Sequence, residues 1–385
     1  MKSITSRPIS ELVESVTTWN PLREKATKKF LYVDLSAVDQ ELKQITQVRE
    51  MACADAPSRA RQLVRPGDIL VSTVRPNLNG VARVPAKLHS ATASTGFCVL
   101  RPKPTKLDSS YLFHWVKSPQ FVSDMVSKAT GASYPAVSDR TVLTSHLPFV
   151  ALSEQRRIAS ILDQANAICA KRREALDQLD ELQQAIFIEM FGDPEANPKG
   201  FPMRTLGEII KFEGGSQPPA STFSSADAPD RIRLVQIRDF KSDRFMTYIP
   251  RKLSKRFFEE DDVMIGRYGP PVFQILRGLS GSYNVALIKA VPRNGVTKDF
   301  VFHLLKEKRL HNFVVANSER TAGQSGVNLE LLEKYSAYLP PMELQIKFLQ
   351  LMGQLKTLRK AMSAGQNESD SLFASLQHRA FRGEL

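Results

Sequence analysis

The chain has few cysteines and no long apolar run, and both absences exclude classes of protein. Its 385 residues include only Cys53, Cys98 and Cys169, which are far apart in the sequence. They predict neither a disulfide framework nor a metal cluster, and they favour a reducing cytoplasm. No run of about 18 apolar residues is present, so we expect no membrane partner and no membrane-spanning helix. The first ten residues, MKSITSRPIS, lack the apolar segment of a signal peptide.

The motifs of common catalytic sites are also missing. The sequence contains no G-x-x-x-x-G-K-[ST] phosphate loop, no Asn/Asp-Pro-Pro-aromatic methyltransferase motif and no G-x-G-x-x-G after a strand. Its six histidines show neither H-x-H nor H-E-x-x-H spacing. The segment DPEANPK at 193–199 loosely resembles a nuclease pattern, but its place after a helix end favours a linker. We therefore expect no catalytic residue, no metal site and no cofactor in this chain.

The net charge of +13 is concentrated in two parts of the chain. Residues 1–150 hold 20 Lys and Arg against 12 Asp and Glu, and residues 193–341 hold 22 against 17. Residues 151–192 are slightly acidic, with five against seven. A basic surface attracts a polyanion through phosphate contacts and release of counterions. The distribution therefore favours nucleic acid as a partner of the two basic segments.

Part of the sequence occurs twice at a constant offset. The two segments are LSEQRRIASILDQ at 152–164 and MELQIKFLQLMGQ at 342–354, and Gln155 of the first has the same position as Gln345 of the second. Phe191 and Phe381 keep the same offset near the other end of each segment. Upstream, PGDILVSTVRP at 66–76 resembles DDVMIGRYGP at 261–270. This order of signals predicts a tandem duplication in which each globular domain is followed by a helix.

The two globular segments are predicted to be rich in short strands. Apolar or alternating runs such as GDILVSTV and YNVALIKAV have turn residues at their edges, and short helices are expected at 109–118 and 299–317. A chain of this length is too long for one core. We predict domains at 1–151 and 193–341, each followed by a helical segment, at 152–192 and 342–385.

Both helical segments show apolar residues at steps of three and four, as in a coiled coil. Ser153 is the expected N-cap of the first helix, and Gly192 and Pro194 end it. A helix of that length spans about 58 Å and needs a partner to cover its apolar stripe. The second helix supplies one, although residues 363–371 are poor in helix formers and predict a kink or fraying.

Together these segments resemble the specificity (S) subunits of type I restriction–modification systems. The resemblance is carried by residues 150–194, by PPMELQIKFLQLMGQ and SLFASLQHRAFRGEL in the second helix, by RPGDILVSTVRPNLNGVARV at 65–84, and by TGASYPAVS at 130–138. It covers most of the chain. The second helix has ELQIKF where the first has SEQRRI.

The resemblance implies an α+β fold with two pseudo-symmetric, β-rich target recognition domains, separated by two long antiparallel coiled-coil-like helices. Each domain would read one half of a bipartite sequence in double-stranded DNA, and the helix pair would set the spacing. The helices would also dock two methyltransferase subunits, which bind S-adenosylmethionine and methylate adenine. Motor–nuclease subunits would join them to cut unmodified DNA. The docking candidates are the basic residues of the first helix: Arg156, Arg157, Lys171, Arg172 and Arg173.

Candidate DNA-reading residues lie in loops that flank the predicted strands. Base edges are read by Arg, Lys, Asn, Gln, Ser and Thr side chains, and aromatic side chains stack beside them. In the first domain the candidates are Arg75, Asn77, Asn79, Lys128, Thr130, Ser133 and Tyr134. In the second they are Ser216, Gln217, Arg267, Tyr268, Arg320, Gln324 and Ser325.

Three other functions fit the sequence to different degrees. A coiled-coil scaffold without a DNA role would not need the basic charge of the two globular segments. A self-sufficient nuclease or methyltransferase is opposed by the missing motifs. A specificity or DNA-binding factor of another modification-based defence system fits the same features, and the neighbouring genes would separate it from a type I subunit.

Overall fold

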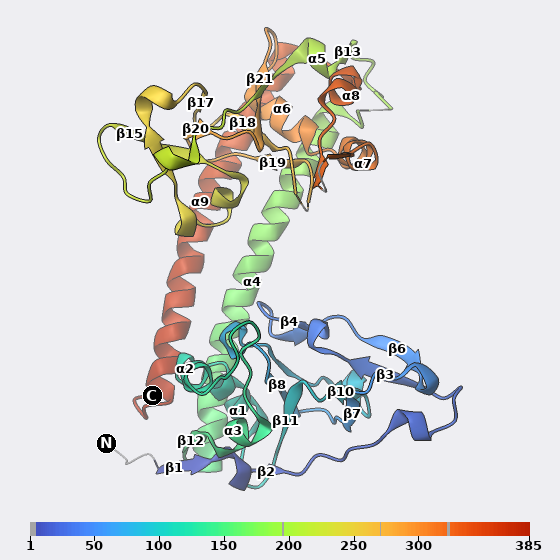
Figure 1. Cartoon of the computed structure of the whole chain (residues 1–385), viewed down its shortest axis with the longest axis vertical. Helices are drawn as coiled ribbons and strands as arrows, with labels where there is room; N and C mark the ends of the chain where they lie inside the picture. The colour runs from blue at the N-terminus through green and yellow to red at the C-terminus, as the bar shows by residue number, and fades with distance from the viewer. Residues whose placement is uncertain (1–4, 195, 270, 322–323) are drawn as a thin grey trace. The chain divides into compact units, whose positions relative to one another are not determined.

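The computed structural model describes residues 5–194, 196–269, 271–321 and 324–385, without the side chains of 319–325 (Figure 1). The chain divides into two compact units. Unit 1 comprises the residues up to Arg173 together with Ala364–Leu385, and unit 2 comprises Glu174–Ser363. Both boundaries fall inside long helices, α4 (Leu152–Phe191) and α9 (Met342–Ala380). Each unit therefore contains part of both helices, whereas the sequence suggested separate helical segments.

Unit 1 is built on two four-stranded sheets. One has the order β2-β11-β8-β9, and its neighbours are antiparallel. The other has the order β6-β3-β10-β7, in which β3 and β10 are parallel. The strands of the first are β2 (Val13–Glu14), β11 (Phe97–Pro102), β8 (Ile69–Ser72) and β9 (Val81–Arg83). The strands of the second are β6 (Arg49–Ala52), β3 (Lys29–Val33), β10 (Thr92–Ser94) and β7 (Ala60–Leu63).

Unit 2 repeats this strand order. Its sheets run β14-β21-β18-β19 and β16-β15-β20-β17, and β15 and β20 again form the parallel pair. The strands of the first are β14 (Ile210–Gly214), β21 (Leu287–Pro292), β18 (Val263–Gly266) and β19 (Gln274–Leu276). The strands of the second are β16 (Tyr248–Pro250), β15 (Arg231–Val235), β20 (Gly281–Tyr283) and β17 (Phe257–Phe258). The predicted pair of pseudo-symmetric, β-rich domains is confirmed.

Smaller elements complete both units. Two-stranded pairs link the beginning and end of each domain: β1 (Thr5–Pro8) with β12 (His146–Phe149), and β13 (Met203–Thr205) with β24 (Ser336–Tyr338). Two short hairpins are β4 (Val38–Asp39) with β5 (Gln44–Ile45), and β22 (Glu319–Thr321) with β23 (Gln324–Gly326). The short helices are α1 (Ser109–Val116), α2 (Pro119–Ser127), α3 (Asp139–Thr144), α5 (Leu206–Ile209), α6 (Lys298–Leu305), α7 (Lys308–Ala316) and α8 (Leu329–Lys334).

Capping side chains explain where several of these helices begin. Asp108 accepts a hydrogen bond from the Tyr111 amide at the start of α1, and Thr297 accepts one from Phe300 at the start of α6. Such bonds satisfy amides that have no partner within the helix. The long helix α4 begins at Leu152, one residue before Ser153, which we expected to be its cap.

Each unit has a main core to which both long helices contribute. In unit 1, Leu162 of α4 and Phe381, just after α9, pack with the strands and with α1. The Phe381 ring lies 5.1 Å from that of Trp115 and 5.4 Å from that of Tyr111. In unit 2, Phe187 of α4 and Phe348 of α9 lie 5.7 Å apart between ring centroids. Burying one such ring contributes roughly 1.5–3 kcal/mol, so the helices are parts of the domain cores.

Within each unit the two long helices run antiparallel and contact each other. In unit 1 the Arg173 guanidinium lies 2.8 Å from the Asp370 carboxylate, and Arg157 donates to the carbonyl of Leu385 at 2.9 Å. In unit 2 Asp180 pairs with Arg359. Several residues of the apolar stripes, which we expected the partner helix to cover, are exposed: Ile168, Leu182, Ile346, Leu349, Leu358 and Leu372.

The helix α9 stays helical through 363–371, so the expected fraying there is wrong. Tertiary contacts compensate for the poor helix formers of this segment. Asp370 pairs with Arg173 of α4 at 2.8 Å, and the side chain of Arg172 lies against Gly365. None of the described helices is long and apolar enough to cross a membrane.

Candidate nucleic-acid interface and helix faces

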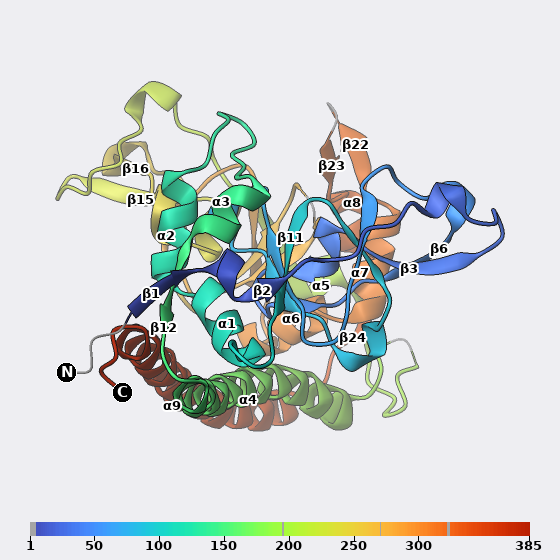
Figure 2. The same ribbon diagram turned by 90° about the horizontal axis from the view of Figure 1, so that it is seen from below.

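Two loops of unit 1 that are far apart in sequence meet at the end of β8. Val74 forms a β-bridge with Ala136, and the Arg75 amide donates to the Pro135 carbonyl at 2.7 Å. The second loop turns sharply at Gly131, whose φ is +103° and where a Cβ would lie 3.0 Å from the Tyr134 carbonyl oxygen. We call residues 73–79 and 130–137 the unit 1 loop junction. Figure 2 shows the segment between α2 and α3 projecting away from α4.

Arg75 and Tyr134 form the exposed centre of the unit 1 loop junction. The Arg75 guanidinium lies 4.7 Å from the centroid of the Tyr134 ring, and Tyr134 is 69% exposed. Among the described residues Arg75 has no ion-pair partner. A guanidinium over an exposed aromatic ring is one of the arrangements that proteins use to contact nucleic acid.

The other candidates of unit 1 have different roles. Asn77 and Ser133 are exposed at the junction, and Thr130 pairs through its backbone with Ala136. Asn79 has a φ of +46° and donates its side-chain amide to the Lys117 carbonyl at 3.3 Å, so it holds the loop. Lys128 is exposed and paired with Asp124 at 2.7 Å.

Unit 2 has a loop junction at the equivalent place, formed by residues 267–268 and 326–327. Tyr268 bridges Gly326, and the Val327 amide donates to the Arg267 carbonyl at 3.0 Å. In unit 1 the Val137 amide donates to the Thr73 carbonyl in the same way, at 2.9 Å. The Arg267 guanidinium lies 5.2 Å from the Tyr268 ring centroid. Both units therefore present an arginine on a tyrosine at this junction.

The remaining candidates of unit 2 are less defined. Gln217 is exposed, whereas Ser216 is half-buried and its amide donates to the Tyr283 carbonyl at 3.2 Å. Arg320 lies on β22, and Gln324 and Ser325 lie on β23. Their side chains are outside the part of the chain that the structure describes.

One basic and aromatic cluster was missed by the sequence analysis. Phe245 is 55% exposed, and the guanidinium groups of Arg238 and Arg244 lie 5.5 and 5.2 Å from its ring centroid. Alternation of basic and aromatic residues in RDFKSDRF at 238–245 is the signal that could have found it.

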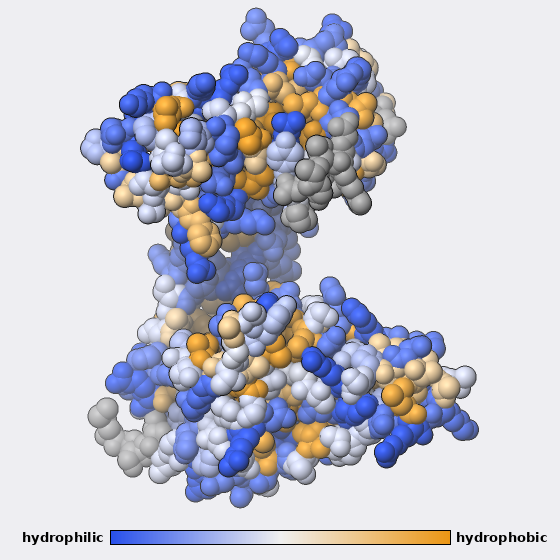
Figure 3. Space-filling model, in the orientation of Figure 1, coloured by the Kyte–Doolittle hydropathy of each residue, from blue (hydrophilic) through white to orange (hydrophobic). Residues whose placement is uncertain are grey.

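The surface of unit 1 on this side is mixed in character. On the face that Figure 3 shows, apolar side chains form small patches among hydrophilic ones. Interfaces with nucleic acid are more polar than interfaces between proteins.

The repeated glutamine has the same function at the start of both long helices. Gln155 accepts a hydrogen bond from the Asp108 amide at 2.9 Å and donates to the carbonyls of Lys106 and Val150. Gln345 accepts from the Thr297 amide at 2.9 Å and donates to the carbonyls of Gly295 and Pro340. Both glutamines are fully buried. This bonding explains why glutamine recurs at the same place in both halves of the sequence.

The five docking candidates are exposed, and three of them also have contacts within the chain. Arg157 pairs with Glu154 at 2.6 Å, Arg173 pairs with Asp370, and the Arg172 side chain lies against Gly365. Arg156 and Lys171 are exposed on the same helix. The position equivalent to Arg156 is Ile346, which is 44% exposed.

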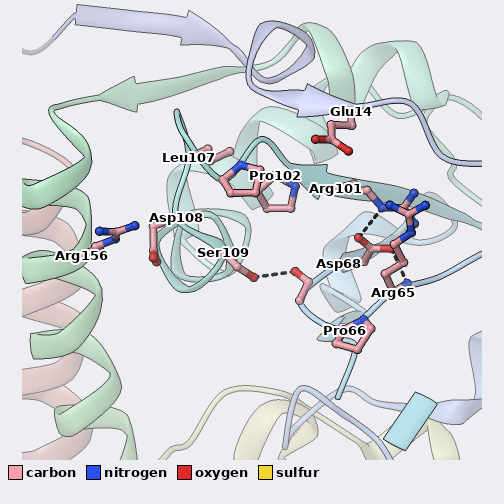
Figure 4. A pocket seen from close by; sticks show the side chains of 12 residues that line it. Glu14, Arg65, Pro66, Asp68, Arg101, Pro102, Leu107, Asp108, Ser109 and Arg156 are labelled. Atoms are coloured by element: carbon pink, nitrogen blue, oxygen red, sulfur yellow. Dashed lines mark hydrogen bonds and ion pairs between the residues drawn. The ribbon is translucent and has the colours of Figure 1, made fainter. Parts of the chain in front are cut away.

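A cavity of about 420 Å³ lies beside the start of α4 in unit 1. Figure 4 shows Arg156 on one side and Arg65 on the other, with the ion pair of Asp68 and Arg101 in its wall. In unit 2 Lys298 occupies the position of Ser109 and pairs with Asp261 and Asp262. The two units thus differ in charge at their helix starts.

Comparisons with known proteins agree with this architecture. The family model of the type I restriction modification DNA specificity domain matches residues 63–179. The StySPI specificity subunit of Salmonella potsdam is 20% identical over 84% of this chain and 76% of its own length. The EcoKI specificity subunit of Escherichia coli K12 is 21% identical, with the same two shares. The chain is thus similar over most of its length to specificity subunits of type I restriction–modification systems, and residues 63–179 match their DNA specificity domain.

Solved structures of specificity subunits and their assemblies share this fold. A chain from a study of complex assembly and conformational transition in the type I R-M system is 25% identical, with a TM-score of 0.60. The match covers 100% of this chain and 99% of that one. The type I S subunit from M. genitalium is 15% identical with a TM-score of 0.53, covering 99% and 97%. The second likeness concerns the fold alone.

The chain also has a buried histidine at the same place in each unit, with different surroundings. His114 donates from Nε2 to Asp163 at 2.8 Å. Burial lowers the pKa of His114, and the bond to Asp163 opposes this effect. His303 is surrounded by the rings of Phe187, Phe302 and Phe348.

The histidine of unit 2 has no equivalent of Asp163. When Gln155 is aligned with Gln345, the position of Asp163 is taken by Gly353. Burial lowers the pKa of His303 to about 3. We therefore expect His303 to stay neutral over the physiological range of pH.

Proposed function

We propose that this chain is a DNA specificity subunit that reads a bipartite sequence in double-stranded DNA, with one half read by each unit. The observation that carries the proposal is the repeated loop junction. Two domains with the same strand order each present an arginine and a tyrosine at the same strand end. The two basic segments of the chain support a polyanionic partner.

The proposal assigns the chemistry to partner subunits. Two methyltransferase subunits would dock on the helices, bind S-adenosylmethionine and methylate adenine, and motor–nuclease subunits would cut unmodified DNA. This chain would contribute sequence reading and no catalytic step. A cytoplasmic setting stays a prediction that rests on the cysteines.

The two docking faces should differ in chemistry. Arg156 is exposed at the start of α4, and exposed Ile346 takes its place on α9. A methyltransferase subunit would meet a charged face on one helix and an apolar face on the other. This difference supports unequal affinities for the two copies.

The decisive experiment is to map methylation by the chain assembled with its adenine methyltransferase. Sequencing that detects N6-methyladenine should find the modification only within one bipartite sequence. Methylation without sequence preference would contradict the proposal. Replacing residues 1–150 with those of another specificity subunit should change one half of the sequence and leave the other unchanged.

A further inference from the structure

The pair of an arginine and a tyrosine ring is formed by non-equivalent residues in the two units. In unit 1, Arg75 lies two residues after Thr73, and its ring comes from the opposite loop at Tyr134. In unit 2, Arg267 takes the place of Thr73, and its ring is the next residue, Tyr268. An arginine over a tyrosine therefore occurs at the loop junction of both units, although the residues that form it are not at equivalent positions.

The backbone of Arg75 is held in an unusual conformation. Its φ and ψ are +51° and +62°, in the left-handed region that residues other than glycine and asparagine rarely adopt. It also precedes Pro76, and a residue before proline is normally extended. Its amide donates to Pro135, and its carbonyl accepts from Leu78 at 2.9 Å. Strained residues that are held in this way concentrate at functional sites.

The stack leaves the guanidinium edge available for a ligand. The guanidinium carbons of Arg75 and Arg267 lie 4.7 and 5.2 Å from the ring centroids of their tyrosines. Such a contact uses the charge of the guanidinium and leaves its N–H groups free to donate to a ligand. Neither Arg75 nor Arg267 has a carboxylate partner among the described residues. A planar fork of donors is complementary to two acceptors that lie side by side.

We propose that Arg75 and Arg267 each read a guanine of the DNA target, by donating to its O6 and N7 in the major groove. Bidentate contact of arginine with these acceptors is the commonest specific contact to a base. Tyr134 and Tyr268 are positioning residues that orient the forks. The inference rests on the proposed function and specifies one base in each half of the sequence.

Binding to modified duplexes tests the inference on the chain assembled with its methyltransferase. In each half of the mapped sequence, guanines are replaced one at a time by 7-deazaguanine, which keeps the base pair but lacks N7. For one position in each half, the intact assembly should bind roughly 5- to 100-fold more weakly. Arg75→Ala should remove this sensitivity in one half only, and Arg267→Ala should remove it in the other.

Further variants separate base reading from general charge. Arg75→Lys keeps the charge without the fork, so it should behave like Arg75→Ala in base preference. Tyr134→Phe keeps the ring and should retain the preference, whereas Tyr134→Ala should weaken it. Arg23→Ala removes an exposed arginine outside the loop junction and should leave the preference unchanged.

Three results would overturn the inference. One is a half-sequence that contains no guanine on either strand. Another is that Arg75→Ala weakens binding equally on every duplex and the variant still responds to 7-deazaguanine. That result would identify Arg75 as a phosphate contact. The third is an unchanged base preference in both alanine variants. Loss of all sequence preference in the unaltered assembly would instead contradict the proposed function.

Discussion

At the residue scale, the buried pair of Arg101 and Asp68 in unit 1 is held by several hydrogen bonds. Arg101 donates to both carboxylate oxygens of Asp68, at 3.0 and 2.7 Å, and both side chains are buried. The Arg65 amide also donates to Asp68. In unit 2 the equivalent Asp262 is partnered by Lys289 and Lys298. Burial alone would raise the pKa of Asp262, but these hydrogen bonds hold it below its usual range.

Removing the cation should therefore destabilise unit 1 strongly. We expect Arg101→Ala to lower the free energy of unfolding by about 3–5 kcal/mol, because it leaves a buried carboxylate uncompensated. Both tryptophans, Trp19 and Trp115, belong to unit 1, so tryptophan fluorescence during urea denaturation reports on that unit. The exposed pair of Lys29 and Glu50 provides the control, and Lys29→Ala should change stability by less than about 1 kcal/mol.

The buried His303 predicts a loss of stability on acidification. An unfolded histidine binds a proton near pH 6.5, whereas burial lowers the pKa of His303 to about 3. Between these values the unfolded state binds more protons, so the free energy of unfolding falls as the pH falls. The slope is at most about 1.4 kcal/mol per pH unit.

Circular dichroism during urea denaturation at pH 7.5 and pH 5 would measure this effect. His303→Phe should show a smaller drop between the two pH values than the unaltered chain. Gly353→Asp restores a carboxylate at the position of Asp163, where a Cβ meets no atom within 4 Å, and should also reduce the drop. Equal drops in all three proteins would exclude His303 as the source.

At the element scale, the long helices were the part of the fold that the sequence predicted best. Steps of three and four apolar residues are local signals, and the repeat alone linked Gln155 to Gln345. The stack of Arg75 on Tyr134 was not predictable, because it depends on two loops meeting at one strand end. The continuity of α9 through 363–371 likewise depends on distant partners such as Arg173.

The two buried glutamines should be equally important for the helix starts. Each makes three hydrogen bonds with backbone groups of its own unit. A leucine side chain can make none of these bonds, so backbone groups next to the helix start would lose their partners. We expect Gln155→Leu and Gln345→Leu each to lower the free energy of unfolding by about 2–4 kcal/mol. Thermal and urea denaturation would measure the change.

Gln164→Leu is the matched control for these substitutions. Gln164 is exposed on α4, and its side chain contacts only Ser160 of the same helix among the described hydrogen bonds. We expect a change within about 0.5 kcal/mol. A similar loss in all three variants would show that the buried hydrogen bonds are not the cause.

At the scale of the whole molecule, the helices are shared between the two units. The boundaries at Arg173/Glu174 and Ser363/Ala364 lie within α4 and α9. If the helix pair sets the distance between the half-sequences, its length should determine the number of base pairs between them.

Lengthening both helices should change the spacing and nothing else. Seven residues inserted after Glu174 and seven after Ser363 keep the apolar register and add about 10 Å. That length corresponds to roughly three base pairs at 3.4 Å each. Methylation mapping should find the same two half-sequences with a longer gap. An insertion in α4 alone should instead break the pairing of the helices and reduce methylation, and an unchanged gap in the double insertion would contradict the spacer role.

The sharing of the helices has a consequence for synthesis of the chain. Unit 1 is completed by Ala364–Leu385, which the ribosome makes only after the whole of Glu174–Ser363. At roughly 5–20 residues per second, this takes about 10–40 seconds. During that time the surface of Tyr111 and Trp115 that Phe381 covers is without its partner. The nascent chain is therefore exposed to aggregation at a known surface, and a chaperone that binds aromatic segments would find its target there.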